Sequence, residues 1–235
     1  MLWVMTHWLA LLLIGMFIFT FLPFLAPLFM ALGWNRLGEA IYTLYIPFCH
    51  QLPQRSWFFF GNKFTYTLSE IEQVYGNTDP WALRFFYGSP QMGWKVAWSD
   101  RMISFYTMTP VFGLLYAALR RWVRRPLPFR IFLLLLMPMA LDGFTHAISD
   151  AVWGISAGGF RDSNAWMSAL TGNALPGFYA GDQAGTFNWW MRLVTGLWAS
   201  VAVVFWAFPW LDRLLRHERT RLTDPHSTHR PKDAL

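Results

Sequence analysis

The sequence has few charges and almost no cysteine. Only 14% of its 235 residues are charged, against the roughly 25% typical of soluble domains, and 55% are hydrophobic. Cys49 is the only cysteine, so the chain cannot close a disulfide within itself. The single cysteine excludes a scaffold held together by intrachain disulfides, and the low share of charged residues argues against an ordinary soluble domain.

Signatures of nucleotide-binding and hydrolytic enzymes are also scarce. The sequence has no phosphate-binding P-loop and no Gly-x-Gly-x-x-Gly dinucleotide fingerprint. Acyl-transfer catalysis is not expected, because no serine, histidine and aspartate can be placed together from the sequence. We therefore predict no catalytic residues, and the sequence identifies no cofactor.

The positive charge is confined to short segments. The net charge is +6, and most of the basic residues lie in two clusters beside apolar runs. This distribution is typical of membrane topology signals and does not favour nucleic-acid binding. The 15 tryptophans and 22 phenylalanines fit the same class, since aromatic residues collect at lipid interfaces.

Apolar runs predict an all-α polytopic membrane protein with four transmembrane helices. A spanning helix needs about 20 mostly apolar residues. Suitable runs lie near 8–32, 102–119, 131–148 and 190–211. An amphipathic stretch at 37–48 predicts a short interfacial helix between the first two spans. Residues 1–211 then form a single membrane domain, and 212–235 form a basic tail that is partly disordered.

Arginine and lysine placement predicts the topology. The connection between the second and third spans is rich in arginine, and so is the tail. Both are expected in the cytoplasm, which places both termini there. The connections that contain residues 63–95 and 154–186 then lie on the outer side. We expect a multi-pass protein of a prokaryotic cytoplasmic membrane.

With this topology, all four spans bring polar residues to the outer face. The candidate cluster consists of Cys49, His50, Gln51, Arg55, Arg101, Asp142, His146, Asp150, Asn188 and Arg192. Asp142, His146 and Asp150 are four residues apart and share one helix face. Asp142 is the deepest, and an ionised group within a span needs a partner. Arg101 and Arg192 are the candidate partners.

Two interpretations of the cluster stay open. It is either a buried ion-pair network that fixes helix register, or a polar pocket for a metal, a quinone, a lipid head group or a proton relay. The candidate metal ligands are His50, Asp142 and His146, with Cys49 or Asp150 in addition. No pair among them has a dedicated metal-binding spacing.

Four ordered motifs resemble an uncharacterised family of prokaryotic integral membrane proteins, a domain of unknown function with a Cys-His-Gln signature. They begin at Cys49, Ser99, Pro138 and Asn188. Compared with the family, the segments near 63–95 and 154–186 resemble insertions. The second motif of the family carries cysteines around its arginine, and this chain lacks them. The resemblance implies a divergent member and supplies no reaction.

The absence of a complete catalytic motif and the lost cysteines favour a structural role. We expect a non-catalytic accessory subunit of a larger prokaryotic membrane complex, respiratory or photosynthetic in type. Its expected partners are membrane lipids and other integral membrane subunits, and not nucleic acid. The alternative is a small membrane enzyme or a metal- or quinone-binding protein with its site at the outer face.

Overall fold

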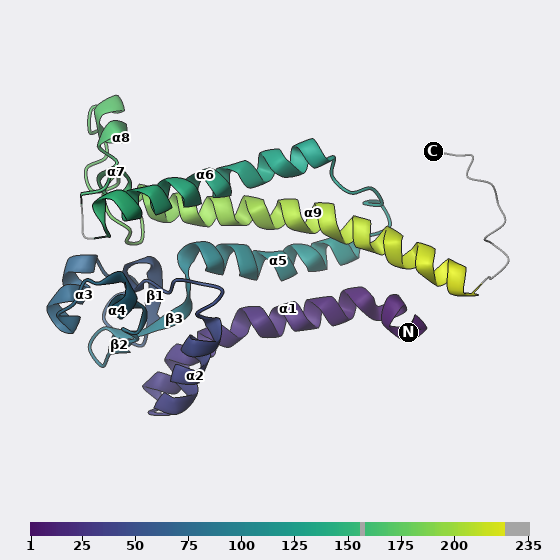
Figure 1. The fold of residues 1–235 in the computed structure, drawn as a ribbon, viewed down its shortest axis with the longest axis horizontal. Helices are drawn as coiled ribbons and strands as arrows, with labels where there is room; N and C mark the ends of the chain where they lie inside the picture. The colour runs from purple at the N-terminus through teal and green to yellow at the C-terminus, as the bar shows by residue number, and fades with distance from the viewer. Residues whose placement is uncertain (156–157, 224–235) are drawn as a thin grey trace.

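A computed structural model gives the fold, and it describes residues 1–155 and 158–223 (Figure 1). The elements, in chain order, are α1 (Leu2–Ala31), α2 (Asn35–Tyr45), the 3-10 turn η1 (Pro53–Arg55), β1 (Ser56–Phe59), α3 (Leu68–Tyr75), α4 (Pro80–Arg84), β2 (Gly88–Ser89), β3 (Gly93–Ser99), α5 (Asp100–Leu119), α6 (Phe129–Trp153), α7 (Phe160–Ser163), α8 (Ala165–Leu170) and α9 (Phe187–Thr223).

Four helices, α1, α5, α6 and α9, are long and apolar enough to cross a membrane. This confirms the predicted helical polytopic membrane fold. Figure 1 shows the four running alongside one another, with α9 packed against both α5 and α6, and α1 packed against α5. A Cβ atom on Gly196 of α9 would lie 2.8 Å from the Arg101 carbonyl oxygen of α5, so glycine permits their close approach.

Two of the predicted boundaries need correction. The first span continues through Pro23 and Pro27 as one helix that begins at Leu2. The last helix continues to Thr223, so residues 212–223 of the predicted basic tail are helical. Arginine, leucine and glutamate are good helix formers, and no glycine or proline interrupts this segment. The predicted disorder falls on residues 224–235, which lie outside the described residues.

Prolines inside the long helices remove backbone donors, and other segments replace them. Proline has no N–H, so it frees the carbonyl four residues earlier. Before Pro23, the freed Phe19 oxygen accepts a hydrogen bond from the Tyr45 hydroxyl at 2.6 Å. Before Pro110, the Tyr106 oxygen accepts one from Thr20 Oγ1 at 3.0 Å. The prolines therefore create acceptors that tie α1 to α2 and α5 to α1.

A small antiparallel sheet was not predicted. Its strand order is β1-β3-β2, and it lies at the end of the long helices where α5 begins (Figure 1). We call residues 46–99 and 158–186 the cap. Its helix α3 begins with a capping box between Thr67 and Glu70.

The predicted short helix between the first two spans is present as α2. It is amphipathic, because Ile41, Tyr42 and Tyr45 are buried whereas Arg36 and Glu39 are exposed. Gly38 brings it close to α1, because a Cβ atom there would lie 2.6 Å from the sulfur of Met30. The buried face of α2 joins a core with Trp98 of β3, so the cap is packed onto α1 and α5 through one hydrophobic cluster.

Candidate charged site in the cap

Charged side chains gather where the cap meets the ends of α5, α6 and α9. We call them the arginine–aspartate cluster: Arg55, Asp100, Arg101, Asp142, His146, Asp150, Arg161, Asp182 and Arg192. Six of these nine residues were predicted as site residues. Asp100, Arg161 and Asp182 were not.

One half of the cluster is built around Asp182 of the cap. Its carboxylate accepts hydrogen bonds from Arg55 Nε at 2.8 Å and from Arg192 Nη1 at 2.5 Å. Arg55 also contacts both carboxylate oxygens of Asp150 on α6, at 2.7 and 2.9 Å. Arg192 on α9 contacts Asp100 at the start of α5, at 2.8 and 3.0 Å. Asp182 thus links the turn η1 to α9.

The other half surrounds Asp142 of α6. Arg101 donates to one carboxylate oxygen at 2.7 Å, and Arg161 donates to the other at 2.6 Å. The ring nitrogen Nδ1 of His146 lies 2.8 Å from the backbone oxygen of Asp142 and 3.5 Å from its carboxylate. Of the two predicted partners of Asp142, Arg101 is its partner, whereas Arg192 binds Asp100 and Asp182 instead.

Asn188 positions the loop that carries Arg161. Its side-chain nitrogen donates to the backbone oxygens of Arg161 at 2.6 Å and Gly181 at 3.1 Å. Its side-chain oxygen accepts from Asn164 at 3.0 Å. Asn164 has a positive φ of 41°, which asparagine tolerates better than most residues. The predicted site residue Asn188 therefore holds the cap in place and takes no part in the ion pairs.

The stretch Cys49-His50-Gln51 lies outside the cluster. The Cys49 sulfur is buried and accepts from the backbone nitrogen of Ser99 at 3.2 Å. Gln51 is buried at a positive φ of 53°, and its backbone oxygen accepts from the buried ammonium of Lys95 at 2.6 Å. His50 is exposed. This stretch is a buried turn around a lysine, and His50 does not join Asp142 and His146.

The charges of the arginine–aspartate cluster compensate one another. Burial opposes ionisation of Asp182, but Arg55 and Arg192 outweigh it and hold the pKa of Asp182 well below its usual range. Burial also opposes the charge on Arg55, and Asp182 and Asp150 outweigh it, which raises the pKa of Arg55. Four arginines face four aspartates, so the ion pairs leave no excess charge for an ionic ligand.

Asp162 lies near the cluster and forms no ion pair among the described residues. Burial, with the nearby charge of Asp182, raises the pKa of Asp162 to about 6. Its Oδ2 atom is buried and has no hydrogen-bond partner among the described residues.

The described residues do not form a metal centre. No group of three or more histidine, cysteine, aspartate or glutamate side chains within 1–155 and 158–223 is arranged to hold a metal ion. The arginines occupy the carboxylate oxygens that a metal ion needs. Three buried nitrogens of the cluster have no hydrogen-bond partner among the described residues: Nε2 of His146, Nε of Arg101 and Nε of Arg161. Of these, only the histidine nitrogen is a possible metal ligand.

The sequence signals for the missed residues were weak. Arg161 and Asp182 lie in a glycine-rich connection without periodicity, although few other residues there carry charge. The same connection contains Gly154-Ile155-Ser156-Ala157-Gly158, which matches the Gly-x-Ser-x-Gly spacing of a nucleophilic serine. Ser156 lies outside the described residues. The motif needs a preceding strand, and here helix α6 precedes it, so its structural context is missing.

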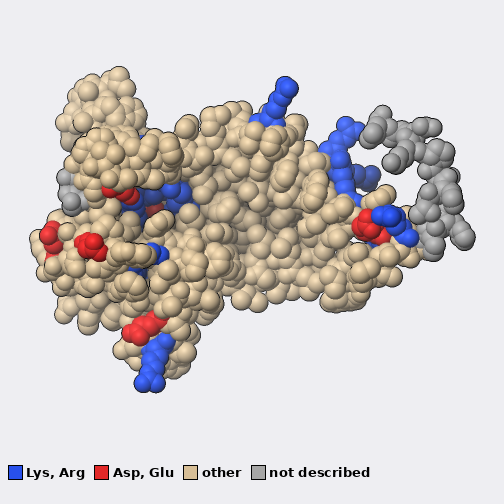
Figure 2. Space-filling view, in the orientation of Figure 1, with Lys and Arg blue, Asp and Glu red and all other residues tan. Residues whose placement is uncertain are grey.

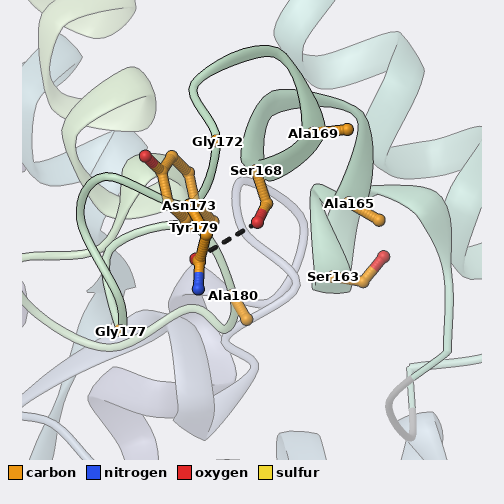
Figure 3. Close-up of a pocket in the computed structure, with 9 residues that line it drawn as sticks. All are labelled: Ser163, Ala165, Ser168, Ala169, Gly172, Asn173, Gly177, Tyr179 and Ala180. Carbon is orange, nitrogen blue, oxygen red and sulfur yellow. Dashed lines mark hydrogen bonds between the residues drawn. The ribbon is translucent and has the colours of Figure 1, made fainter.

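The cap also contains an open pocket of about 560 Å³, formed by α7, α8 and the loop that follows (Figure 3). Small and neutral side chains line it, and a hydrogen bond joins Ser168 to Asn173 at its wall. None of its lining residues belongs to the arginine–aspartate cluster. The pocket therefore adds no charged group to the site.

The fold and the cluster define a helical membrane protein with a charge-compensated network beneath a small cap. The chain is similar to the uncharacterized protein MJ1492 of Methanocaldococcus jannaschii, with 27% identity over 203 residues that cover 84% of this chain and 88% of that protein. No family model matches the chain, so the Cys-His-Gln signature has no support from that comparison. No solved structure matches it either.

Proposed function

We propose that this chain is a non-catalytic integral membrane subunit that supports a larger complex in a prokaryotic cytoplasmic membrane. One observation carries the proposal: every arginine of the arginine–aspartate cluster is paired with a carboxylate of the same chain. A site that binds an ionic substrate needs unpaired charge or an open metal position. A self-paired network instead fixes how the cap and the helices sit on one another.

The surface of α6 provides room for partner helices. Leu134, Leu141 and Phe144 are 56%, 55% and 66% exposed, and among the long helices α6 is the least buried. In a membrane such a face contacts lipid tails or other apolar helices. Respiratory and photosynthetic complexes are the first in which to look for this subunit.

The test is the composition of the particle extracted from the native membrane in mild detergent. Native mass spectrometry should find this chain together with other integral membrane subunits in fixed ratio. A particle that contains only this chain, as one or several copies, would contradict the proposal. An Asp142→Asn variant should lose both the cap structure and the association, because the association depends on the folded cap.

A second candidate, a quinone-binding protein or small membrane enzyme, is favoured by the buried and unpaired Nε2 of His146. Because Nδ1 of His146 donates to the backbone oxygen of Asp142, Nε2 of the uncharged ring is an acceptor, suited to the hydroxyl of a quinol, the reduced form of a quinone. If this role is correct, a His146→Gln variant should fold with an unchanged melting temperature and lose the quinone that co-purifies with the wild type. If the wild type carries no quinone, the second candidate fails.

A further inference from the structure

A pocket of about 260 Å³ lies at the other end of the molecule, far along the long helices from the cap. We call it the basic pocket. Arg120, at the end of α5, and Arg216 and Arg219, on α9, line it together with Asp212, and Trp8 of α1 forms part of its wall. Figure 2 shows basic and acidic side chains gathered at this end of the molecule.

Asp212 organises the arginines of the basic pocket but does not neutralise them. Its carboxylate is 8% exposed and pairs with Arg120, and with Arg216 at 2.7 Å. It also accepts a hydrogen bond from the indole N–H of Trp8 at 3.3 Å. One carboxylate thus faces three guanidinium groups, which leaves an excess of two positive charges in one small pocket. The arginine–aspartate cluster has no such excess.

Donors remain available in the basic pocket. Within residues 1–155 and 158–223, Nε of Arg120 is buried and has no hydrogen-bond partner. Over the same residues Arg219 forms no ion pair. The side chain of Arg216 contacts Asp212, yet it is still 55% exposed. Guanidinium groups bind phosphate oxygens through paired N–H donors, so these side chains are suited to a phosphate group.

The rest of the wall is mostly apolar. Trp8 is buried, and Met5, Leu215 and the polar Thr6 complete the lining. The pocket lies next to the arginine-rich connection between α5 and α6, at a helix end where lipid head groups are expected. A basic pocket between spanning helices, with apolar walls, fits a head-group phosphate with its glycerol and upper acyl chains beside the tryptophan.

We propose that the basic pocket binds the phosphate group of an anionic phospholipid. The proposal is independent of the role of the chain in a complex, since it rests on the residues of the pocket alone. Inorganic phosphate has the same recognition chemistry, and the experiment separates these two sources.

The experiment titrates the delipidated full-length protein in detergent with phosphatidylglycerol, phosphatidylcholine or inorganic phosphate, and native mass spectrometry counts bound molecules. The wild type should retain one phosphatidylglycerol more tightly than any phosphatidylcholine. In an Arg216→Gln/Arg219→Gln variant the affinity for phosphatidylglycerol should fall about 30-fold, since each arginine near a lipid surface contributes roughly a factor of five. Both side chains are exposed, so the variant should fold.

The matched control is Arg121→Gln/Arg125→Gln, which removes the same charge from exposed positions outside the pocket. It should change the affinity less than threefold or so. Equal losses in the two double variants would overturn the proposal, because general surface charge would then explain the binding. Equal retention of phosphatidylcholine would also overturn it. Binding of inorganic phosphate without binding of phosphatidylglycerol would assign the pocket to the free anion and overturn the lipid assignment.

Discussion

Arg55 and Asp150 form a two-point salt bridge, with N–O distances of 2.7 and 2.9 Å, although they are 95 residues apart in the sequence. Arg55 belongs to the turn η1 of the cap, and Asp150 belongs to the last turns of α6. The remaining Nε of Arg55 binds Asp182. A single guanidinium group therefore joins three segments of the chain, and the stability of the cap should depend on it.

The first prediction concerns Arg55. Arg55→Gln should lower the stability by about 3–5 kcal/mol, because it leaves Asp150 without an arginine partner and Asp182 with Arg192 alone in a largely buried site. Arg55→Lys should recover only part of the loss, since an ammonium group cannot bind Asp150 at two points and reach Asp182 as well. Thermal unfolding followed by tryptophan fluorescence in detergent measures both variants.

The control for Arg55 is the ion pair of Lys63 with Glu70, whose side chains are 58% and 32% exposed. Lys63→Gln should change the stability much less than Arg55→Gln does, because water screens an exposed pair. Similar losses for Arg55→Gln and Lys63→Gln would show that the Arg55 network does not hold the cap.

The long helices could be predicted from the sequence because an apolar run of about 20 residues matches the thickness of a bilayer, and few soluble domains contain one. Asp142 was also predictable as a residue in need of a partner, since a charge within a span is costly alone. Its position did not reveal which arginine would reach it. Arg101 and Arg192 were equivalent candidates, and Arg161, which also binds Asp142, lies in a connection without periodicity.

The sheet was missed for a similar reason. β1 and β3 pair across more than 30 intervening residues, with Phe59 opposite Trp94, and both strands are short. A short aromatic stretch such as Trp57-Phe58-Phe59-Phe60 is equally typical of a membrane-interface anchor. Pairing between distant segments depends on the tertiary fold, and local pattern does not carry that information.

The second prediction concerns Thr20 and Pro110. Thr20→Val should destabilise the protein by about 1–3 kcal/mol, because the carbonyl that Pro110 frees at Tyr106 would lose its donor while buried. Pro110→Ala restores a helical N–H to that carbonyl. Thr20→Val should therefore cost less in the Pro110→Ala background, and a double-mutant cycle of unfolding free energies measures the coupling. Additive effects would contradict this account.

The third prediction compares two glycines. Gly196→Ala should lower the stability by about 1–3 kcal/mol, because its Cβ would crowd the backbone of α5 at Arg101 and Phe105. Gly15→Ala should leave the stability unchanged or raise it slightly, since nothing lies within 4 Å of the new Cβ. Both are helical glycines, so a difference between their melting temperatures reports the packing of α9 on α5. Equal effects would contradict that interpretation.

The fourth prediction concerns the pH dependence that Lys95 causes. Burial lowers the pKa of Lys95 to about 7; the nearby Cys49 thiol opposes this shift, and Arg84 adds to it. Its ammonium is bonded to the backbone oxygens of Gln51 and Arg84, at 2.6 and 2.8 Å. Between about pH 7 and 10.5 the unfolded chain binds a proton that the folded chain has released, so the stability should rise with pH across this window.

The measurement is the difference in unfolding free energy between the wild type and Lys95→Met. The wild type should gain up to about 1.4 kcal/mol per pH unit relative to the variant between pH 7 and 10.5, and the difference should be flat below that window. The tyrosines that titrate over the same range contribute equally to both proteins, so their contribution cancels in this difference. A constant difference at every pH would mean that Lys95 stays charged in the folded protein.

The last prediction tests the orientation in the membrane. In a Cys49→Ser background, which removes the only cysteine, Val74→Cys places a thiol on α3 of the cap, where Val74 is 53% exposed. Arg125→Cys places one in the arginine-rich connection between α5 and α6. Because such connections stay in the cytoplasm, a membrane-impermeant maleimide should label Val74→Cys in intact spheroplasts and Arg125→Cys only after permeabilisation. The reverse pattern would place the cap in the cytoplasm and the basic pocket at the outer face, where the arginine-rich connection would then contradict the positive-inside rule.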